Sequence, residues 1–366
     1  MKKNKQIILA TEPFYHNNKI FDEKNPITNR DDFQRPYIEL KKAWLKKNID
    51  FDTEDLIDMN RVTAIIFFNI PDENNEIKKL ATENNIPIYS IINELPNIHE
   101  NNKKLNLHVN FKKIFTYQDS LIDNIKYFKL NYSFIFPEKV IGNFTRKGFC
   151  TLIANNKTLN YHNELYSTRK KIIYWFEKKH PNMFRFYGGG WNEKQDYISQ
   201  KCRNILKKII HCLEAKHSDT FNSLNKKLAL LNNKLFEISL STYEGKIKKK
   251  KDVLEKFRFS ICLENASSEP GWITEKIFDS LFSGCVPIYQ GPDNINDIIP
   301  EKCYIDFRKF KSYASMYSYL LNYSERDYRC FIDAVNKFIS SKAKNIFTVK
   351  YFVNTITSNI KINYET

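Results

Sequence analysis

Residues 257–292 decide the fold class and read FRFSICLENASSEPGWITEKIFDSLFSGCVPIYQGP. The apolar residues at 257, 259, 261 and 263 alternate with the residues between them, which predicts a β-strand with these four side chains on one face. The apolar spacing over 274–283 predicts a helix with one buried face, and the apolar run over 285–289 predicts another strand. A strand, a helix and a second strand in this order are typical of a parallel sheet covered by helices.

The start of this helix is the first candidate site. Thr274 is predicted to be its N-cap, with Glu275 and Lys276 in the first turn. Ligands of open α/β sheets bind beyond the carboxyl ends of the strands, and a helix N-terminus favours phosphate through its free N–H groups and its dipole. Lys276 would add positive charge, and Glu275 would accept hydrogen bonds from ribose hydroxyls. Helix physics alone favours a simpler interpretation, an ordinary capped helix in which Glu275 interacts with the dipole.

The alternation of strands and helices extends through most of the chain. Strands are predicted at 6–10, 62–68, 87–92, 113–117 and 149–154, and helices at 37–47, 74–84 and 167–179. The pattern restarts after about residue 145. We therefore expect an α/β protein with one domain over 1–145, a second over 146–345, and a C-terminal segment over 346–366. A basic, amphipathic helical stretch at about 200–240 is predicted to be an insertion in the second domain.

Composition limits the classes of function. The chain has 366 residues, of which 42% are hydrophobic, so it can bury a sizeable core and is not disordered throughout. Lys and Arg outnumber Asp and Glu by 58 to 42, which favours anionic partners. The basic residues are spread along the chain, and only Lys248–Lys251 forms a run of four. A nucleic-acid-binding protein is an alternative, but it would need basic and aromatic residues gathered on one element.

Cysteine usage and hydropathy predict the compartment. The chain has seven cysteines, an odd number, and none of them shows C-x-x-C spacing. This pattern favours free thiols in a reducing compartment. Four of the cysteines are expected to be buried: Cys150, Cys262, Cys285 and Cys303. No run reaches the roughly 18 apolar residues of a membrane-spanning helix. We expect a cytoplasmic protein. The lysine-rich stretch 200–251 would allow peripheral binding at the inner face of the membrane, although a helical hairpin packed on the second domain is the commoner fate of such helices.

The stretch 264–291 also resembles the donor-binding motif of glycosyltransferase family 10, the α-1,3/1,4-fucosyltransferases. The matching elements are Glu264-Asn265, Trp272-Ile273-Thr274-Glu275-Lys276, Val286-Pro287-Ile288 and Gly291. Two residues depart from the usual pattern of the family, Leu263 in place of Phe and Trp272 in place of Tyr. The order and the spacing agree over about 35 residues, which makes the resemblance specific.

Weaker resemblances extend to both sides of this motif. They include Asn93-Glu94-Leu95-Pro96, the strand 149–155 followed by Arg169, the turn 186–191, and Tyr243-Glu244-Gly245. The resemblance thus covers most of residues 87–310, and it is weakest in the N-terminal domain. That is expected of a domain that binds the acceptor, because the acceptor varies.

The resemblance implies a GT-B fold, in which two Rossmann-like domains face each other across a cleft. The C-terminal domain would bind GDP-fucose, and the residues implied in donor binding are Arg169, Glu264, Asn265, Trp272, Thr274, Glu275 and Lys276. The N-terminal domain would bind an acceptor glycan, which can be lipid-linked. Glu94 follows a predicted apolar strand and is the candidate general base, since a carboxylate at a strand end can be tuned by burial.

The reaction implied is an inverting transfer of fucose to an acceptor hydroxyl, with another GDP-sugar as the alternative donor. Fixed cations would stabilise the departing GDP, so no metal cofactor is expected to be required, although a divalent cation could stimulate the reaction. The triplet Asp50-Phe51-Asp52 matches an Asp-x-Asp metal motif. Three residues match easily by chance, and we expect the edge of a strand here instead of a metal site.

Overall fold

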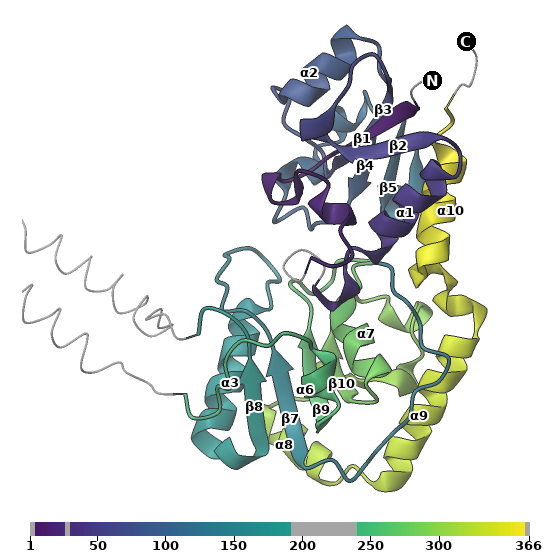
Figure 1. Ribbon diagram of the computed structural model, residues 1–366. Helices are drawn as coiled ribbons and strands as arrows, with labels where there is room; N and C mark the ends of the chain where they lie inside the picture. Colours follow the sequence, from purple (N-terminus) through teal and green to yellow (C-terminus); the bar gives the residue numbers. More distant parts are fainter. Residues whose placement is uncertain (1–3, 26–29, 192–239, 363–366) are drawn as a thin grey trace, which may run out of the picture.

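The computed structural model describes residues 4–25, 30–191 and 240–362, which form two α/β domains (Figure 1). Each domain is built around one parallel sheet. The N-terminal sheet has the order β2-β1-β3-β4-β5-β6, with β1 (Lys5–Ala10), β2 (Ile49–Thr53), β3 (Val62–Phe68), β4 (Ile88–Ile92), β5 (Lys113–Thr116) and β6 (Tyr127–Lys129). The C-terminal sheet has the order β11-β10-β9-β7-β8, with β7 (Gly148–Ile153), β8 (Phe184–Tyr187), β9 (Phe257–Leu263), β10 (Val286–Gln290) and β11 (Ile305–Asp306). The predicted fold class is confirmed.

The α-helices of the described residues pack around the two sheets. They are α1 (Arg35–Leu45), α2 (Glu76–Glu83), α3 (Tyr166–Lys179), α6 (Lys251–Leu254), α7 (Glu275–Phe282), α8 (Tyr313–Leu321), α9 (Glu325–Ser340) and α10 (Val349–Asn359). Two strands, Val62–Phe68 and Phe257–Leu263, have the predicted bounds. Both are apolar runs in the interior of a parallel sheet, where the pattern is clearest.

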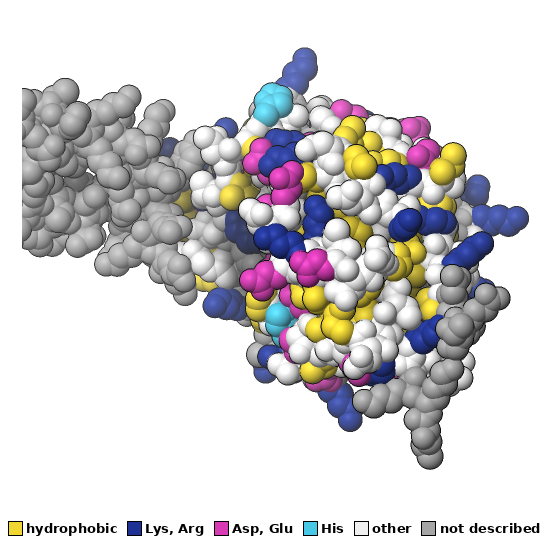
Figure 2. All heavy atoms as spheres, turned by 90° about the horizontal axis from the view of Figure 1, so that it is seen from above, with side chains coloured by type: hydrophobic (Ala, Val, Ile, Leu, Met, Phe, Trp, Pro, Cys, Tyr) yellow, Lys and Arg dark blue, Asp and Glu magenta, His cyan; other side chains and the backbone are white. Residues whose placement is uncertain are grey.

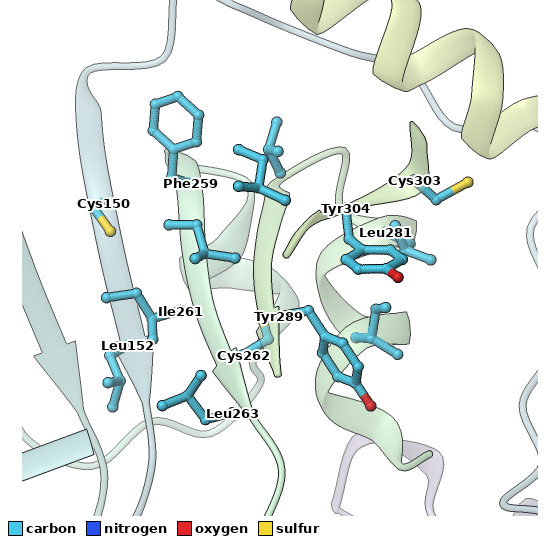
Figure 3. Packing of buried hydrophobic residues seen from close by; sticks show 14 of the residues in the cluster. Cys150, Leu152, Phe259, Ile261, Cys262, Leu263, Leu281, Tyr289, Cys303 and Tyr304 are labelled. Atoms are coloured by element: carbon cyan, nitrogen blue, oxygen red, sulfur yellow. The ribbon is translucent and has the colours of Figure 1, made fainter. Parts of the chain in front are cut away.

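Strand β9 is buried on both faces. The alternating pattern places the apolar side chains at 257, 259, 261 and 263 on one face, but every residue of the strand from Phe259 to Leu263 is buried. Helix α7 covers the second face, where the Cys262 thiol lies 3.1 Å from the Ser280 hydroxyl. Figure 3 shows Phe259, Ile261 and Leu263 following one another along β9, beside β7. A strand in the middle of a sheet with helices on both sides has no solvent-facing side.

The C-terminal segment returns to the N-terminal domain. Phe352 and Ile356 of α10 are buried in the same apolar cluster as Leu40 and Trp44 of α1, and Figure 1 shows the two helices side by side. Between the domains, the Phe134 amide donates a hydrogen bond to the Phe347 carbonyl at 2.8 Å. The chain therefore crosses between the domains twice, and the two crossings are hydrogen bonded to each other.

Basic side chains do not gather into one patch on the end of the N-terminal domain. Figure 2 shows that Lys and Arg are interspersed there with acidic and apolar side chains. The predicted insertion at 200–240 lies almost wholly outside the described residues. Within the described residues, no helix combines the length and the apolar character needed to cross a membrane.

Four of the cysteines are buried free thiols, as predicted: Cys150, Cys262, Cys285 and Cys303. Burial raises the pKa of the Cys262 thiol to about 11. These thiols are therefore protonated at neutral pH and act as small apolar side chains in the core.

Candidate active site

A cavity of about 570 Å³ lies between the two domains. Its lining includes the residues at the carboxyl ends of β4, β5 and β6 on one side, and of β7, β8 and β9 on the other. The start of α7 also borders it, through Thr274, Glu275 and Lys276. The position agrees with the rule that open α/β sheets bind ligands beyond the carboxyl ends of their strands.

Lys276 is held at the cavity wall by two neighbours. Its ammonium group donates to Thr274 Oγ1 at 2.9 Å and to Glu264 Oε2 at 3.2 Å. Burial lowers the pKa of Lys276, but the carboxylates of Glu264 and Glu275 outweigh it and raise the pKa above its usual value. The side chain keeps 20% of its surface exposed, so a fixed positive charge faces the cavity.

Glu264 has a different place from the one that the sequence predicts. Its side chain is fully buried, and the residue is not among those that line the cavity. Its carboxylate accepts hydrogen bonds from the Thr274 amide at 3.0 Å, from the Thr274 hydroxyl at 2.7 Å and from the Tyr289 hydroxyl at 3.2 Å. Glu264 therefore positions the start of α7 and the Lys276 ammonium from behind the cavity wall.

The same contacts correct the expectation for Thr274. It stands at the N-cap position of α7, but its side chain makes no capping hydrogen bond. Its hydroxyl is instead used by Glu264 and Lys276. The first amide groups of α7 are thus not capped by this side chain, and the Glu275 carboxylate accepts a hydrogen bond from its own amide.

Arg169 is brought to the same wall from α3. Its Nη2 donates to the carbonyl oxygens of Leu263 at 2.6 Å and of Glu264 at 2.7 Å, and to Asn265 Oδ1 at 3.1 Å. Arg169 also lines the cavity. Asn265 lines the cavity as well. The structure thus places both residues with Lys276 at the lining of one cavity.

Glu275 belongs to a second ion-pair cluster on the cavity wall. Its Oε1 lies 3.4 Å from the Lys250 ammonium and 3.6 Å from that of Lys276. Burial alone would raise the pKa of Glu275, but the two ammonium groups lower it below its usual range. The carboxylate therefore stays ionised, and it can accept hydrogen bonds from hydroxyl groups. Lys250 also contacts Asp279, one helical turn further along α7, at 2.8 Å.

Lys250 has no distinctive signal of its own in the sequence. Its only signal is the run Lys248–Lys251, and a run of lysines is typical of a solvated surface. In the structure the Lys250 side chain contacts α7 and is 19% exposed. Its backbone amide also donates to Asp31 of the N-terminal domain at 3.0 Å. Lys157 is a second cation without a motif signal in the sequence; it lines the cavity from the loop after β7.

Glu94 lies across the cavity from these groups. It follows β4, as predicted, and two buried asparagines fix its backbone: its amide donates to Asn69 Oδ1 at 3.1 Å, and its carbonyl accepts from Asn102 at 3.0 Å. Burial raises the pKa of the Glu94 carboxyl, and the opposing effects of Lys276 and Lys157 are smaller. The position and the raised pKa suit a general base that faces bound substrate.

Trp272 connects the donor motif to the other domain. Only 1% of its surface is exposed, and it is buried in an apolar cluster of the N-terminal domain. Its ring packs edge-on against Tyr117 and Tyr132, with centroids 4.6 Å and 5.7 Å away. Trp272 also borders the cavity. Its large buried surface makes it a contact between the domains, a role that motif spacing alone does not indicate.

Gly271 makes this contact sterically possible. Its φ of +80° lies in the left-handed region, and a Cβ atom there would stand 2.3 Å from the Tyr117 carbonyl oxygen. We expect Gly271→Ala to destabilise the protein by about 2–4 kcal/mol, through backbone strain and the overlap with Tyr117. Thermal unfolding measures the effect. Gly245→Ala is the matched control, because Gly245 has a φ of +90° but nothing within 4 Å of the added Cβ. Equal losses of stability in the two variants would contradict this account.

The Asp-x-Asp triplet lies in β2, the edge strand of the N-terminal sheet, as predicted. Asp50 pairs with Arg61 at 2.6 Å, and Asp52 pairs with Lys41 at 2.9 Å. Neither carboxylate borders the cavity. Both are accounted for as partners of neighbouring basic side chains.

Comparison with known proteins finds a family similarity in the C-terminal part of the chain. Residues 198–351 match the family model described as Glycosyltransferase family 10 (fucosyltransferase) C-term. This part of the chain is therefore similar to the C-terminal domain of that family. The matched residues include the wall formed by Lys250, Glu264, Asn265 and α7.

The curated relatives belong to the same family of enzymes by name. An alpha-(1,3)-fucosyltransferase of Helicobacter pylori is 24% identical over 159 residues, which are 43% of this chain and 31% of the relative. An alpha-(1,4)-fucosyltransferase of Arabidopsis thaliana is 39% identical over 64 residues, which are 18% of this chain and 16% of the relative. The matches thus span less than a third of the length of these relatives.

Solved structures of other proteins share the fold of the described residues. A crystal structure of an alpha1,3-fucosyltransferase with GDP-fucose has a TM-score of 0.53 at 13% identity and covers 99% of this chain and 92% of the other. The Anabaena protein Alr3699/HepE in complex with UDP-glucose has a TM-score of 0.52 at 9% identity, covering 96% and 98%. At these identities the likeness concerns the fold, a GT-B arrangement that the two chains share with this protein.

Proposed function

We propose that this protein transfers fucose from GDP-fucose to a hydroxyl group of an acceptor glycan, with inversion at the anomeric carbon. The observation that carries the proposal is the cavity between the domains. One wall presents Lys276 and Arg169, which belong to the donor motif or contact it, and the opposite wall presents Glu94. A carboxylate that faces fixed cations across a substrate-sized cavity fits a base acting on the acceptor and cations acting on the leaving group.

In the proposed reaction the Glu94 carboxylate takes the proton of the acceptor hydroxyl while that oxygen attacks the anomeric carbon of fucose. The bond from this carbon to the pyrophosphate oxygen breaks, and GDP leaves with the electron pair. Lys276, Arg169 and the amide groups at the start of α7 stabilise the negative charge that develops on the pyrophosphate. Because these charges belong to the protein, we propose that the reaction requires no divalent cation, although a divalent cation can stimulate it.

The first test of the proposal concerns which nucleotide the protein binds. We expect GDP to bind more tightly than UDP or ADP, as the family resemblance of the donor motif implies. Calorimetric titration of the three nucleotides measures this, and a preference for UDP would remove the assignment of the donor. A screen of GDP-fucose, GDP-mannose and UDP-sugars then separates fucose from another GDP-linked sugar, which is the second candidate donor.

We also propose that the protein is cytoplasmic and that the basic stretch 200–251 can bind anionic lipid, which would bring the site to lipid-linked acceptors. Most of this stretch lies outside the described residues. Flotation with liposomes that contain or lack anionic lipid is the test. Equal flotation with both kinds of liposome would favour a helical hairpin packed on the C-terminal domain instead.

A further inference from the structure

Several buried polar atoms without a partner gather at one side of the cavity. Asn131 is only 5% exposed, yet neither its Nδ2 nor its Oδ1 has a hydrogen-bond partner among the described residues. The same holds for the Tyr117 hydroxyl, Asn93 Oδ1 and the indole nitrogen of Trp272. All four residues line the cavity. Since more than nine in ten buried polar groups in proteins have a partner, such a group of unpartnered atoms at one place points to a ligand that supplies the partners.

These residues stand on the side of the cavity that holds Glu94. Asn93 is its neighbour in the chain, Tyr117 follows β5, and Asn131 follows β6, so three adjacent strands deliver them to one edge of the N-terminal sheet. Trp272 reaches them from the other domain and packs against Tyr117. The cations Lys276 and Arg169 belong to the opposite wall. The unpartnered atoms of Asn93, Tyr117 and Asn131 therefore lie on the same side of the cavity as Glu94.

The chemistry of these atoms is that of a neutral polyol site. The Asn131 amide offers one donor and one acceptor group, the Tyr117 hydroxyl offers both, the indole N–H donates and Asn93 Oδ1 accepts. None of these groups is charged at neutral pH. A sugar hydroxyl both donates and accepts, so two or three adjacent hydroxyls would pair with such a set, and aromatic rings favour the apolar face of a sugar ring.

We propose that Asn131, together with Tyr117 and Trp272, binds the hydroxyl groups of the acceptor sugar beside Glu94, and that Asn131 determines which acceptor sugar is accepted. This inference rests on the proposed function, because it places an acceptor where Glu94 takes its proton. The competing explanation is that water molecules form hydrogen bonds with the same atoms. Gln118 provides the control: its Oε1 is also buried and unpartnered, but the residue does not line the cavity.

The test compares Asn131→Leu and Asn131→Asp with Gln118→Met in the full-length protein loaded with GDP. Saturation-transfer NMR measures the binding of methyl β-glycosides of glucose, galactose, N-acetylglucosamine and N-acetylgalactosamine. We expect the wild-type protein to bind at least one of them, and both Asn131 variants to bind it roughly 10-fold more weakly or worse, as the loss of one or two hydrogen bonds implies. The Gln118→Met variant should bind it like the wild type.

Measuring donor binding distinguishes a failure of this inference from a failure of the proposed function. The affinity for GDP-fucose, measured by calorimetry, should be the same in all variants, which also shows that they are folded. Unchanged glycoside binding by both Asn131 variants, an equal loss in Gln118→Met, or no glycoside binding by the wild-type protein would overturn the inference. Failure of the wild-type protein to bind GDP or GDP-fucose would instead overturn the proposed function.

Discussion

Glu94→Gln is expected to lower the rate of fucose transfer by roughly 10²–10⁴-fold, the range for a lost general base. Glutamine keeps the shape of the side chain but cannot take the proton of the acceptor hydroxyl. Glu94 lies across the cavity from Lys276 and Arg169, so the affinity for GDP should not change. Transfer kinetics and calorimetric titration of GDP measure the two effects separately.

Glu100→Gln is the matched control for this variant. Glu100 is the next carboxylate along the chain, but its side chain is 68% exposed and the residue does not line the cavity. A normal rate for Glu94→Gln together with a slow Glu100→Gln variant would show that the base is assigned to the wrong carboxylate. That result would not change the assignment of Lys276 and Arg169 to donor binding.

The pH dependence of transfer offers an independent test of Glu94. Its base form is the carboxylate, which is lost as the pH falls through the pKa. Because burial raises this pKa, the acid limb of kcat/KM should lie at a higher pH than the ordinary titration of a glutamate. An acid limb at or below that ordinary value would mean that another group carries the proton.

Lys276→Ala is expected to lower kcat/KM with GDP-fucose on the order of 10²-fold or more, as for other fixed charges that stabilise a transition state. The ammonium group would interact with the pyrophosphate in the bound donor, and more strongly as GDP departs, so both binding and turnover should suffer. Steady-state kinetics and GDP titration measure the change. Lys276→Arg keeps the positive charge and should recover part of the rate.

Stability has to be followed in the same variants. Lys276 neutralises the fully buried Glu264 carboxylate, so Lys276→Ala should also lower the midpoint of thermal unfolding. Lys171→Ala removes an exposed lysine of α3 and should change neither kinetics nor stability. Wild-type kinetics for Lys276→Ala would place this ammonium group outside the reaction.

The local parts of the site follow from the sequence because they rest on short-range patterns. The strand 257–263, the helix after it and the order of Thr274, Glu275 and Lys276 are set by apolar spacing and by the family motif. Glu94 is placed correctly because a polar residue after a buried strand comes to the carboxyl edge of the sheet. These features need no knowledge of distant contacts.

The parts that sequence reasoning misses depend on contacts between distant segments. Lys250 meets Glu275 and Asp279 only because α6 packs beside α7. Glu264 carries the same motif signal as its neighbours, but its burial depends on Tyr289 of the adjacent strand. A three-residue strand such as β6 is too short to give a recognisable apolar pattern.

The double crossing has a mechanical consequence for the two domains. A single flexible linker would let the domains rotate about many axes. We expect two crossings joined at Phe134 and Phe347 to restrict this rotation to axes that pass near both residues. Helix α10 also contributes side chains to the core of the N-terminal domain, so a fragment that ends at residue 145 would lack part of that core. The two halves of this protein are separate in shape but interdependent in folding.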